Sequence, residues 1–197
     1  MKTIALFSLL VVTIFIGCKK SDETRDSYFT QSTFIEDPGN PGLPIYSELG
    51  YNTFGAYYDR ETFISNDYDV PCKVIVTNDT TTFIFQGTKE NSQMTLKIGI
   101  PDNKPDTYDD LLAYNDTVID LTKCKITTKI NGYTSVAQVI DGRFEIRKAQ
   151  KLFVDNSQLE VIIAGIFEFQ LLINNEPIAI SSGRFDFGVG YSNFFEY

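Results

Sequence analysis

Two short clusters of aspartates hold the side chains best suited to binding a metal ion. They are Asp106, Asp109 and Asp110 around Tyr108, and Asp67 and Asp69 around Tyr68. Calcium takes roughly six to eight oxygen ligands, many of them carboxylates. Neither cluster has the spacing of a known calcium-binding loop. We therefore interpret the first cluster as carboxylates at the start of a helix and the second as a solvated turn, and we predict no metal and no cofactor.

The chain lacks the side chains on which most hydrolytic enzymes depend. It contains no histidine, which excludes Ser-His-Asp and Cys-His catalysis and histidine-ligated zinc. Glu160 and Glu168 share one face of a predicted strand, but eight residues at about 3.3 Å each place them roughly 26 Å apart. A glycosidase pair needs a separation of about 5 to 9.5 Å. The sequence thus predicts a protein that is not an enzyme.

Cys18 is the reactive side chain with the most informative surroundings. Lys2 supplies a positive charge, residues 4–16 form an apolar run, and Gly17 provides the small residue that a signal peptidase requires. A run of this length is typical of a secretory signal, because a membrane-spanning helix needs about 20 residues. Residues 1–17 are predicted to be a signal peptide.

Gly17 followed by Cys18 resembles the bacterial lipobox, in which the cysteine is diacylated and becomes the mature N-terminus. Phe15 and Ile16 depart from the usual pattern, and an ordinary cleaved signal beside an incidental cysteine is the alternative. Each buried acyl methylene contributes about 0.8 kcal/mol, so several chains would hold the protein on a bilayer. The resemblance implies lipidation of Cys18 and an outer-membrane location.

Lys19, Lys20, Asp22 and Glu23 follow the cysteine, with Ser21 interrupting them. This stretch resembles the surface-export signal of Bacteroidota lipoproteins, which implies exposure at the cell surface; a solvated charged tether is the alternative. Residues 37–44 contain three prolines and two glycines, which preclude regular structure. We predict a lipidated N-terminus and flexible tether over residues 18–49 and a single β domain over residues 50–197.

Cys72 and Cys124 form an even pair, which in an exported protein most often forms a disulfide. Cys72 alternates with Val74, and Cys124 alternates with Ile126, so both thiols are expected to point into the core. In the chain-entropy model, a loop of this length would contribute about 4 kcal/mol. The sequence predicts a Cys72–Cys124 disulfide, with two buried free thiols as the alternative.

The chain is acidic, with 26 acidic and 17 basic residues and a formal charge of −9. Such a charge argues against nucleic acid and against anionic lipid head groups as partners. Divalent cations or neutral ligands fit it better. Contact with the membrane is expected only through the lipid anchor.

Short runs of alternating apolar residues, separated by turn signals, indicate a β domain. Residues 159–171 form the clearest strand, and Asn131-Gly132 and Asp141-Gly142 favour tight hairpins. One short helix is expected at 107–114, with Thr107 as its N-cap. About ten strands in roughly 150 residues predict an all-β antiparallel sandwich, with a closed β-barrel as the alternative.

A Gly-Arg-Phe sequence occurs at residues 142–144 and again at 183–185, and we interpret both copies as strand starts. Asn52-Thr53-Phe54-Gly55, residues 164–169 and residues 180–186 together resemble a group of Bacteroidota lipoproteins of uncharacterised function. The likeness covers both ends of the domain and not its middle. It implies a lineage and a β fold, but no activity and no site residues.

Thr80 follows Asp79 and precedes Thr81, while Thr117 follows Asp116 and precedes Val118. Both triplets resemble the O-glycosylation site of exported Bacteroidota proteins. The resemblance implies that Thr80 and Thr117 are glycosylated, although two such triplets also occur by chance in a threonine-rich chain.

Four tyrosines fall near predicted strand ends or loops, where they would stack on sugar rings or anchor a protein partner; these are Tyr57, Tyr58, Tyr68 and Tyr191. We expect a lipid-anchored outer-membrane lipoprotein that is a non-enzymatic binding or structural component of the cell envelope. The alternative is a glycan-binding accessory lipoprotein of a nutrient-uptake system, which requires exposed aromatic rings side by side. A carboxylate-dependent hydrolase would require two acids converging in a cleft.

Overall fold

The structure is a computed structural model that describes residues 32–65, 70–154 and 157–197. The predicted signal peptide, Cys18, and the Asp67–Asp69 cluster with Tyr68 lie outside the described residues. Within those ranges, no helix has the length and the apolar character needed to cross a membrane.

Eleven strands and two short 3₁₀ helices make up the described part of the chain. The strands are β1 (Thr53–Tyr58), β2 (Glu61–Ile64), β3 (Cys72–Thr77), β4 (Thr80–Lys89), β5 (Ser92–Pro101), β6 (Thr117–Asp120), β7 (Lys125–Ile130), β8 (Tyr133–Val154), β9 (Ser157–Ile173), β10 (Glu176–Val189) and β11 (Phe194–Glu196). The helices are η1 (Tyr108–Tyr114), at the position predicted for a helix, and η2 (Leu121–Lys123).

Eight of these strands form a closed antiparallel barrel in the order β4-β2-β1-β10-β9-β8-β7-β5, and β5 pairs back to β4. The β2–β4 seam is short and consists of Phe63 opposite Lys89 and Ile64 opposite Thr88. Outside the barrel path, β3 pairs with β4, β11 pairs with β3, and β6 pairs with β8. The predicted all-β class is confirmed, and the closed barrel describes the structure better than the sandwich does.

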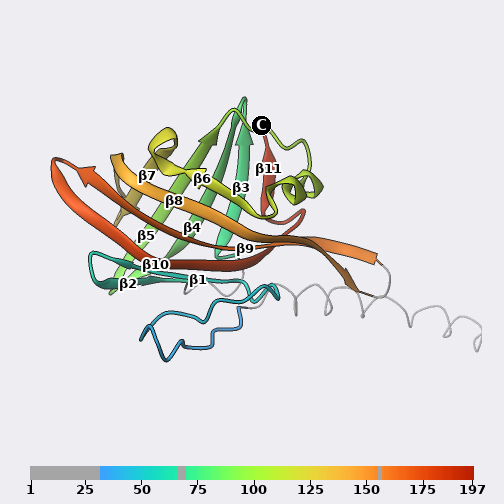
Figure 1. The fold of residues 1–197 in the computed structure, drawn as a ribbon, viewed down its shortest axis with the longest axis horizontal. Coiled ribbons are helices and arrows are strands. Elements are labelled where there is room, and N and C mark those ends of the chain that lie inside the picture. Colours follow the sequence, from blue (N-terminus) through green and yellow to red (C-terminus); the bar gives the residue numbers. More distant parts are fainter. Residues whose placement is uncertain (1–31, 66–69, 155–156) are drawn as a thin grey trace, which may run out of the picture.

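The long strands bend because they contain β-bulges. Figure 1 shows β8, β9 and β10 running across the view, while β3, β4 and β5 rise steeply across them. The register shifts between Val139 and Asp141 in β8, and between Ile180 and Gly183 in β10. A bulge bends its strand and increases the twist, so these strands curve around the core where straight strands would form a flat layer.

The two Gly-Arg-Phe copies follow these bulges, on the two strands that flank β9. The prediction that they are strand starts is therefore wrong, as is the hairpin predicted at Asp141-Gly142. Gly142 lies inside β8 with φ 149°, against the backbone of Phe169 in β9. The Asn131-Gly132 hairpin is confirmed, since these two residues have φ 49° and 90° and join β7 to β8.

Phenylalanine rings fill the inside of the barrel. Phe144 of β8 and Phe185 of β10, the aromatic residues of the two repeats, stack with ring centres 4.9 Å apart and an interplanar angle of 6°. Other fully buried rings surround this pair, namely Phe54, Phe63, Phe83, Phe85, Phe167 and Phe187. The aromatic residues thus serve mainly as core, and any binding surface must lie on the outside.

Candidate functional site

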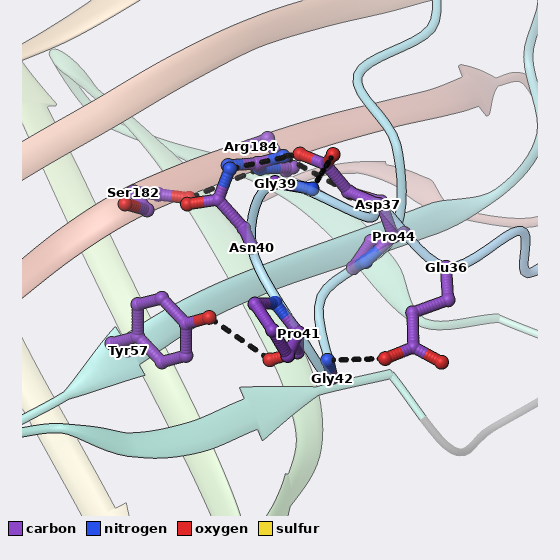
Figure 2. Close-up of polar contacts among 10 residues, drawn as sticks. All are labelled: Glu36, Asp37, Gly39, Asn40, Pro41, Gly42, Pro44, Tyr57, Ser182 and Arg184. Carbon is purple, nitrogen blue, oxygen red and sulfur yellow. Dashed lines mark hydrogen bonds and ion pairs between the residues drawn. The ribbon is translucent and has the colours of Figure 1, made fainter.

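A loop over residues 36–44 is held against β10 by one ion pair, formed by Asp37 and Arg184 (Figure 2). The Asp37 carboxylate also accepts hydrogen bonds from the Gly39 N–H and the Asn40 amide, each at 2.9 Å. These contacts, led by the Asn40 hydrogen bond, lower the pKa of Asp37 below its ordinary value of 3.8. The Tyr57 hydroxyl donates to the Pro41 carbonyl at 2.9 Å and ties the loop to β1.

A buried carboxylate holds the next part of the chain. Asp186 on β10 is 1% exposed. It accepts hydrogen bonds from three consecutive backbone N–H groups, those of Leu49, Gly50 and Tyr51, at 2.8 to 3.2 Å. Leu43 is fully buried as well. Contacts with the barrel thus begin well before residue 50, the predicted start of the domain, and residues 36–51 are anchored to β10 at two points.

The two described cysteines are free thiols, so the predicted Cys72–Cys124 disulfide is not formed in this structure. Cys72 lies opposite Phe85, which lies opposite Leu96, which lies opposite Thr128. Three strand spacings, roughly 14 Å, therefore separate Cys72 from Thr128, and Cys124 lies four residues before Thr128 in the chain. A disulfide needs Cα atoms within about 7 Å. The alternation of side chains predicted correctly that the Cys72 thiol is buried. Alternation gives the face on which a residue lies, but not the distance between two residues on different strands.

The described aspartate cluster caps a helix. Asp110 accepts hydrogen bonds from the backbone N–H and the hydroxyl of Thr107, at 2.8 and 3.0 Å, at the start of η1. Asp109 pairs with Lys151 at 3.2 Å and accepts a hydrogen bond from Gln158. Among the described residues, no group of three or more acidic or cysteine side chains is arranged to hold a metal ion.

A depression of about 590 Å³ lies on the outer surface where β8 and β10 bulge beside β9. Its charged residues are Asp141, Arg143 and Glu168. Arg143 pairs with Glu168 at 3.0 Å and lies 4.0 Å from Glu145, which in turn pairs with Arg147 at 2.7 Å. The charges of this open surface thus largely neutralise one another, and the two glutamates are bound to arginine.

A second surface has a different charge pattern. We call it the lysine–threonine face, the outward side of β3, β4, β5 and β7, which lies opposite their buried alternating residues. It contains four lysines and six threonines and no acidic residue; they are Lys73, Lys97, Lys125, Lys129, Thr77, Thr80, Thr82, Thr88, Thr95 and Thr127. The bordering turns carry Asp79, Glu90 and Asp102.

A groove of about 310 Å³ runs along this face. Gly99 of β5, which has no side chain, lies at its floor between Thr82 of β4 and Lys125 of β7. Ile75 and Ile84 line the groove as well, and Ile84 is largely buried. The groove therefore has an apolar floor with hydroxyl and ammonium groups around it.

The predicted glycosylation positions are separated in space. Thr80 begins β4 and lines the groove of the lysine–threonine face, whereas Thr117 begins β6 on the other side of β8. Both side chains are half-buried, and glycosylation of either residue stays a prediction.

Exposed aromatic rings do not gather into a strip within the described ranges. Tyr133 lies at the β7–β8 hairpin, Phe153 lies near the far end of β8, and Tyr191 packs against Tyr108 with ring centres 5.2 Å apart. Tyr58 is buried. The described part of the chain therefore shows no stacking platform of the kind that an aromatic glycan site requires.

No protein-family model matches the chain, and neither does any curated protein or solved structure. The resemblance to Bacteroidota lipoproteins therefore stays a prediction, and the surface of the barrel is what indicates a function.

Proposed function

We propose that this protein is a lipid-anchored component of the outer membrane, and that its β domain is a non-enzymatic binding module. The lysine–threonine face is the observation that supports the binding role. It combines four lysines without an acidic neighbour on the same face, in a chain with a net charge of −9. A positive patch is electrostatically complementary to a negatively charged partner, so this separation of charge favours an anionic ligand.

Two further observations favour binding by an outer surface. The barrel interior is filled by buried phenylalanine rings, so a ligand would contact the outside of the sheet. The outward glutamates of β8 and β9, Glu145 and Glu168, are paired with arginines on an open surface. A catalytic acid instead needs a desolvated site that a substrate can enter. These features fit a binding role better than hydrolysis.

The anchor is tested by feeding cells a labelled fatty acid and following wild-type protein and the Cys18→Ser variant. We expect label in the wild-type protein, retention in the detergent phase, and loss of both in the variant. Cys124→Ser is the matched control, because it removes a thiol from the folded domain and should keep the label. Wild-type protein that takes up no label and washes off in detergent-free buffer would overturn the anchor.

The binding role is tested separately, on the lysine–threonine face. Substitutions there should change binding and leave fatty-acid labelling intact.

A further inference from the structure

The four lysines of the lysine–threonine face lie on neighbouring strands, and none pairs with an acid of the described residues. Lys97 of β5 lies opposite Thr127 of β7. Lys97 is therefore the diagonal neighbour of both Lys125 and Lys129, with its Cα atom about 7 to 8 Å from theirs. Lys73 lies in the same row as Lys97, two strand spacings or about 10 Å away. Like charges at such positions repel one another. The face without a ligand is therefore less stable than the same face with its charges neutralised.

Most basic side chains elsewhere in the described ranges form ion pairs. Arg143 pairs with Glu168, Arg147 pairs with Glu145, and Arg184 pairs with Asp37. Within the described ranges, none of the four lysines of the lysine–threonine face forms an ion pair. Their charge is therefore available to a ligand with several negative groups.

The side chains between the lysines indicate what else the ligand carries. Threonine hydroxyls and the Gln86 and Gln93 amides lie along the same strands, and they both donate and accept hydrogen bonds. A polymer that carries hydroxyl groups beside its negative charges matches this mixture. An acidic polysaccharide is such a polymer.

Other anionic partners match the face less well. The outward side chains of β3, β4, β5 and β7 include no aromatic ring on which a nucleic-acid base would stack, and no arginine for bidentate phosphate contacts. A protein partner is typically anchored by tryptophan, tyrosine or arginine. A lipid surface is bound by protruding apolar residues, but Ile84 is largely buried and Ile75 is half-buried.

We propose that the lysine–threonine face binds an acidic polysaccharide, whose carboxylate or sulfate groups contact Lys97, Lys125 and their two neighbours while the sugar lies along the Gly99 groove. This inference rests on the proposed function, since it names the ligand class of that binding module. It concerns the ligand alone and does not depend on lipidation of Cys18.

The test measures binding of mature protein in detergent micelles to polygalacturonate by isothermal titration. Fully methyl-esterified polygalacturonate is the neutral match, because it keeps the sugar and removes the charge. We expect binding to the acid, no binding to the ester, and weaker binding as salt screens the charges. Dextran sulfate is a second polyanion, and binding to it through the same lysines supports the proposal with sulfate as the anion.

Two pairs of variants localise the contact. Lys97→Gln combined with Lys125→Gln should weaken binding at least about tenfold, because each lost charge contact is worth a large factor in affinity. Lys148→Gln combined with Lys151→Gln removes the same charge from β8 and should leave affinity within about twofold. Gly99→Thr keeps every charge but fills the groove, and it should weaken binding also.

The proposal is overturned if neither polyanion binds, if the ester binds as well as the acid, or if the two double variants lose affinity equally. Lysine-dependent binding to vesicles containing phosphatidylglycerol, with no binding to either polysaccharide, would assign the face to a membrane surface and overturn it too. Fatty-acid labelling of the same variants should stay at the wild-type level, so failure of this inference and failure of the anchor are distinguishable.

Discussion

The Asp186 carboxylate accepts a hydrogen bond at 2.8 Å from the backbone N–H of Gly50, 136 positions earlier in the chain. The flanking N–H groups of Leu49 and Tyr51 donate to the same carboxylate. Three donors on one buried charge fix the chain just before β1 enters the sheet beside β10. The segment that leads toward the predicted lipid anchor is therefore attached to the central strands of the barrel.

Replacing Asp186 by alanine should strongly destabilise the protein, because three N–H groups lose their acceptor. A hydrogen bond to a charged group is worth about 1.5 to 3 kcal/mol, and buried groups left without partners cost more. We expect a loss of about 3 kcal/mol or more in the free energy of unfolding, measured in urea. Glu168→Gln, on an exposed carboxylate, is the control and should shift stability by less than about 0.5 kcal/mol. An Asp186→Ala protein as stable as wild type would contradict this role.

Acid should loosen the 36–44 loop through Asp37. The folded-state pKa of Asp37 is lowered, so its contribution is fully present above the ordinary value of 3.8 and is lost as pH falls through the lower folded value. The Gly39 N–H donates to this carboxylate, and its amide chemical shift should report the titration. We expect a midpoint below 3.8 in wild type and a higher midpoint in Arg184→Gln. A wild-type midpoint at or above 3.8 would refute the assignment.

Local patterns predicted much of the fold because strands and tight turns are encoded locally. Alternation located β3, β5 and β9, and Asn131-Gly132 identified a hairpin through its two positive φ angles. The same logic failed at Asp141-Gly142, since an Asp-Gly pair suits a bulge as well as a hairpin. Only the pairing of β8 with β9 distinguishes the two, and the resulting bend is why a barrel replaces the predicted sandwich.

The candidate surface was missed because net charge is a sum over the whole chain. Lys125 and Lys129 are each two residues from Thr127, and Lys97 is two residues from Thr95. Residues two apart lie on the same face of a strand, so the predicted strands alone would have placed these lysines on outward faces. That they lie on one continuous face depends on β5 pairing with β7, which local sequence does not encode. Contacts such as Asp37 with Arg184, 147 positions apart, are beyond local patterns for the same reason.

The two thiols of the β domain should be free and should differ in reactivity. Burial raises the pKa of the half-buried Cys124 to about 11, and burial also holds the pKa of the fully buried Cys72 well above its ordinary value. At pH 8 only about one Cys124 in a thousand is thiolate, so alkylation should be slow and should accelerate about tenfold per pH unit. Cys72 should react only on unfolding. Mass spectrometry of timed iodoacetamide reactions measures both rates, and denatured, unreduced protein without a free thiol would refute the prediction.

A side chain at Gly165 of β9 should destabilise the protein, because two neighbouring strands close over this position. A Cβ atom there would overlap the Glu145 carbonyl oxygen of β8 and lie 2.7 Å from the Phe185 ring of β10. Overpacking of this kind costs about 1 to 3 kcal/mol, so Gly165→Ala should lower the free energy of unfolding by that amount in urea. Gly99→Ala is the matched control, since its Cβ would meet its nearest neighbours at 3.4 Å, an ordinary contact. It should leave stability unchanged or raise it slightly by restricting the unfolded chain. If the two substitutions changed the free energy of unfolding equally, β8, β9 and β10 would not pack as closely as described. The stacking of Phe144 on Phe185 would then not require a glycine on the strand between them.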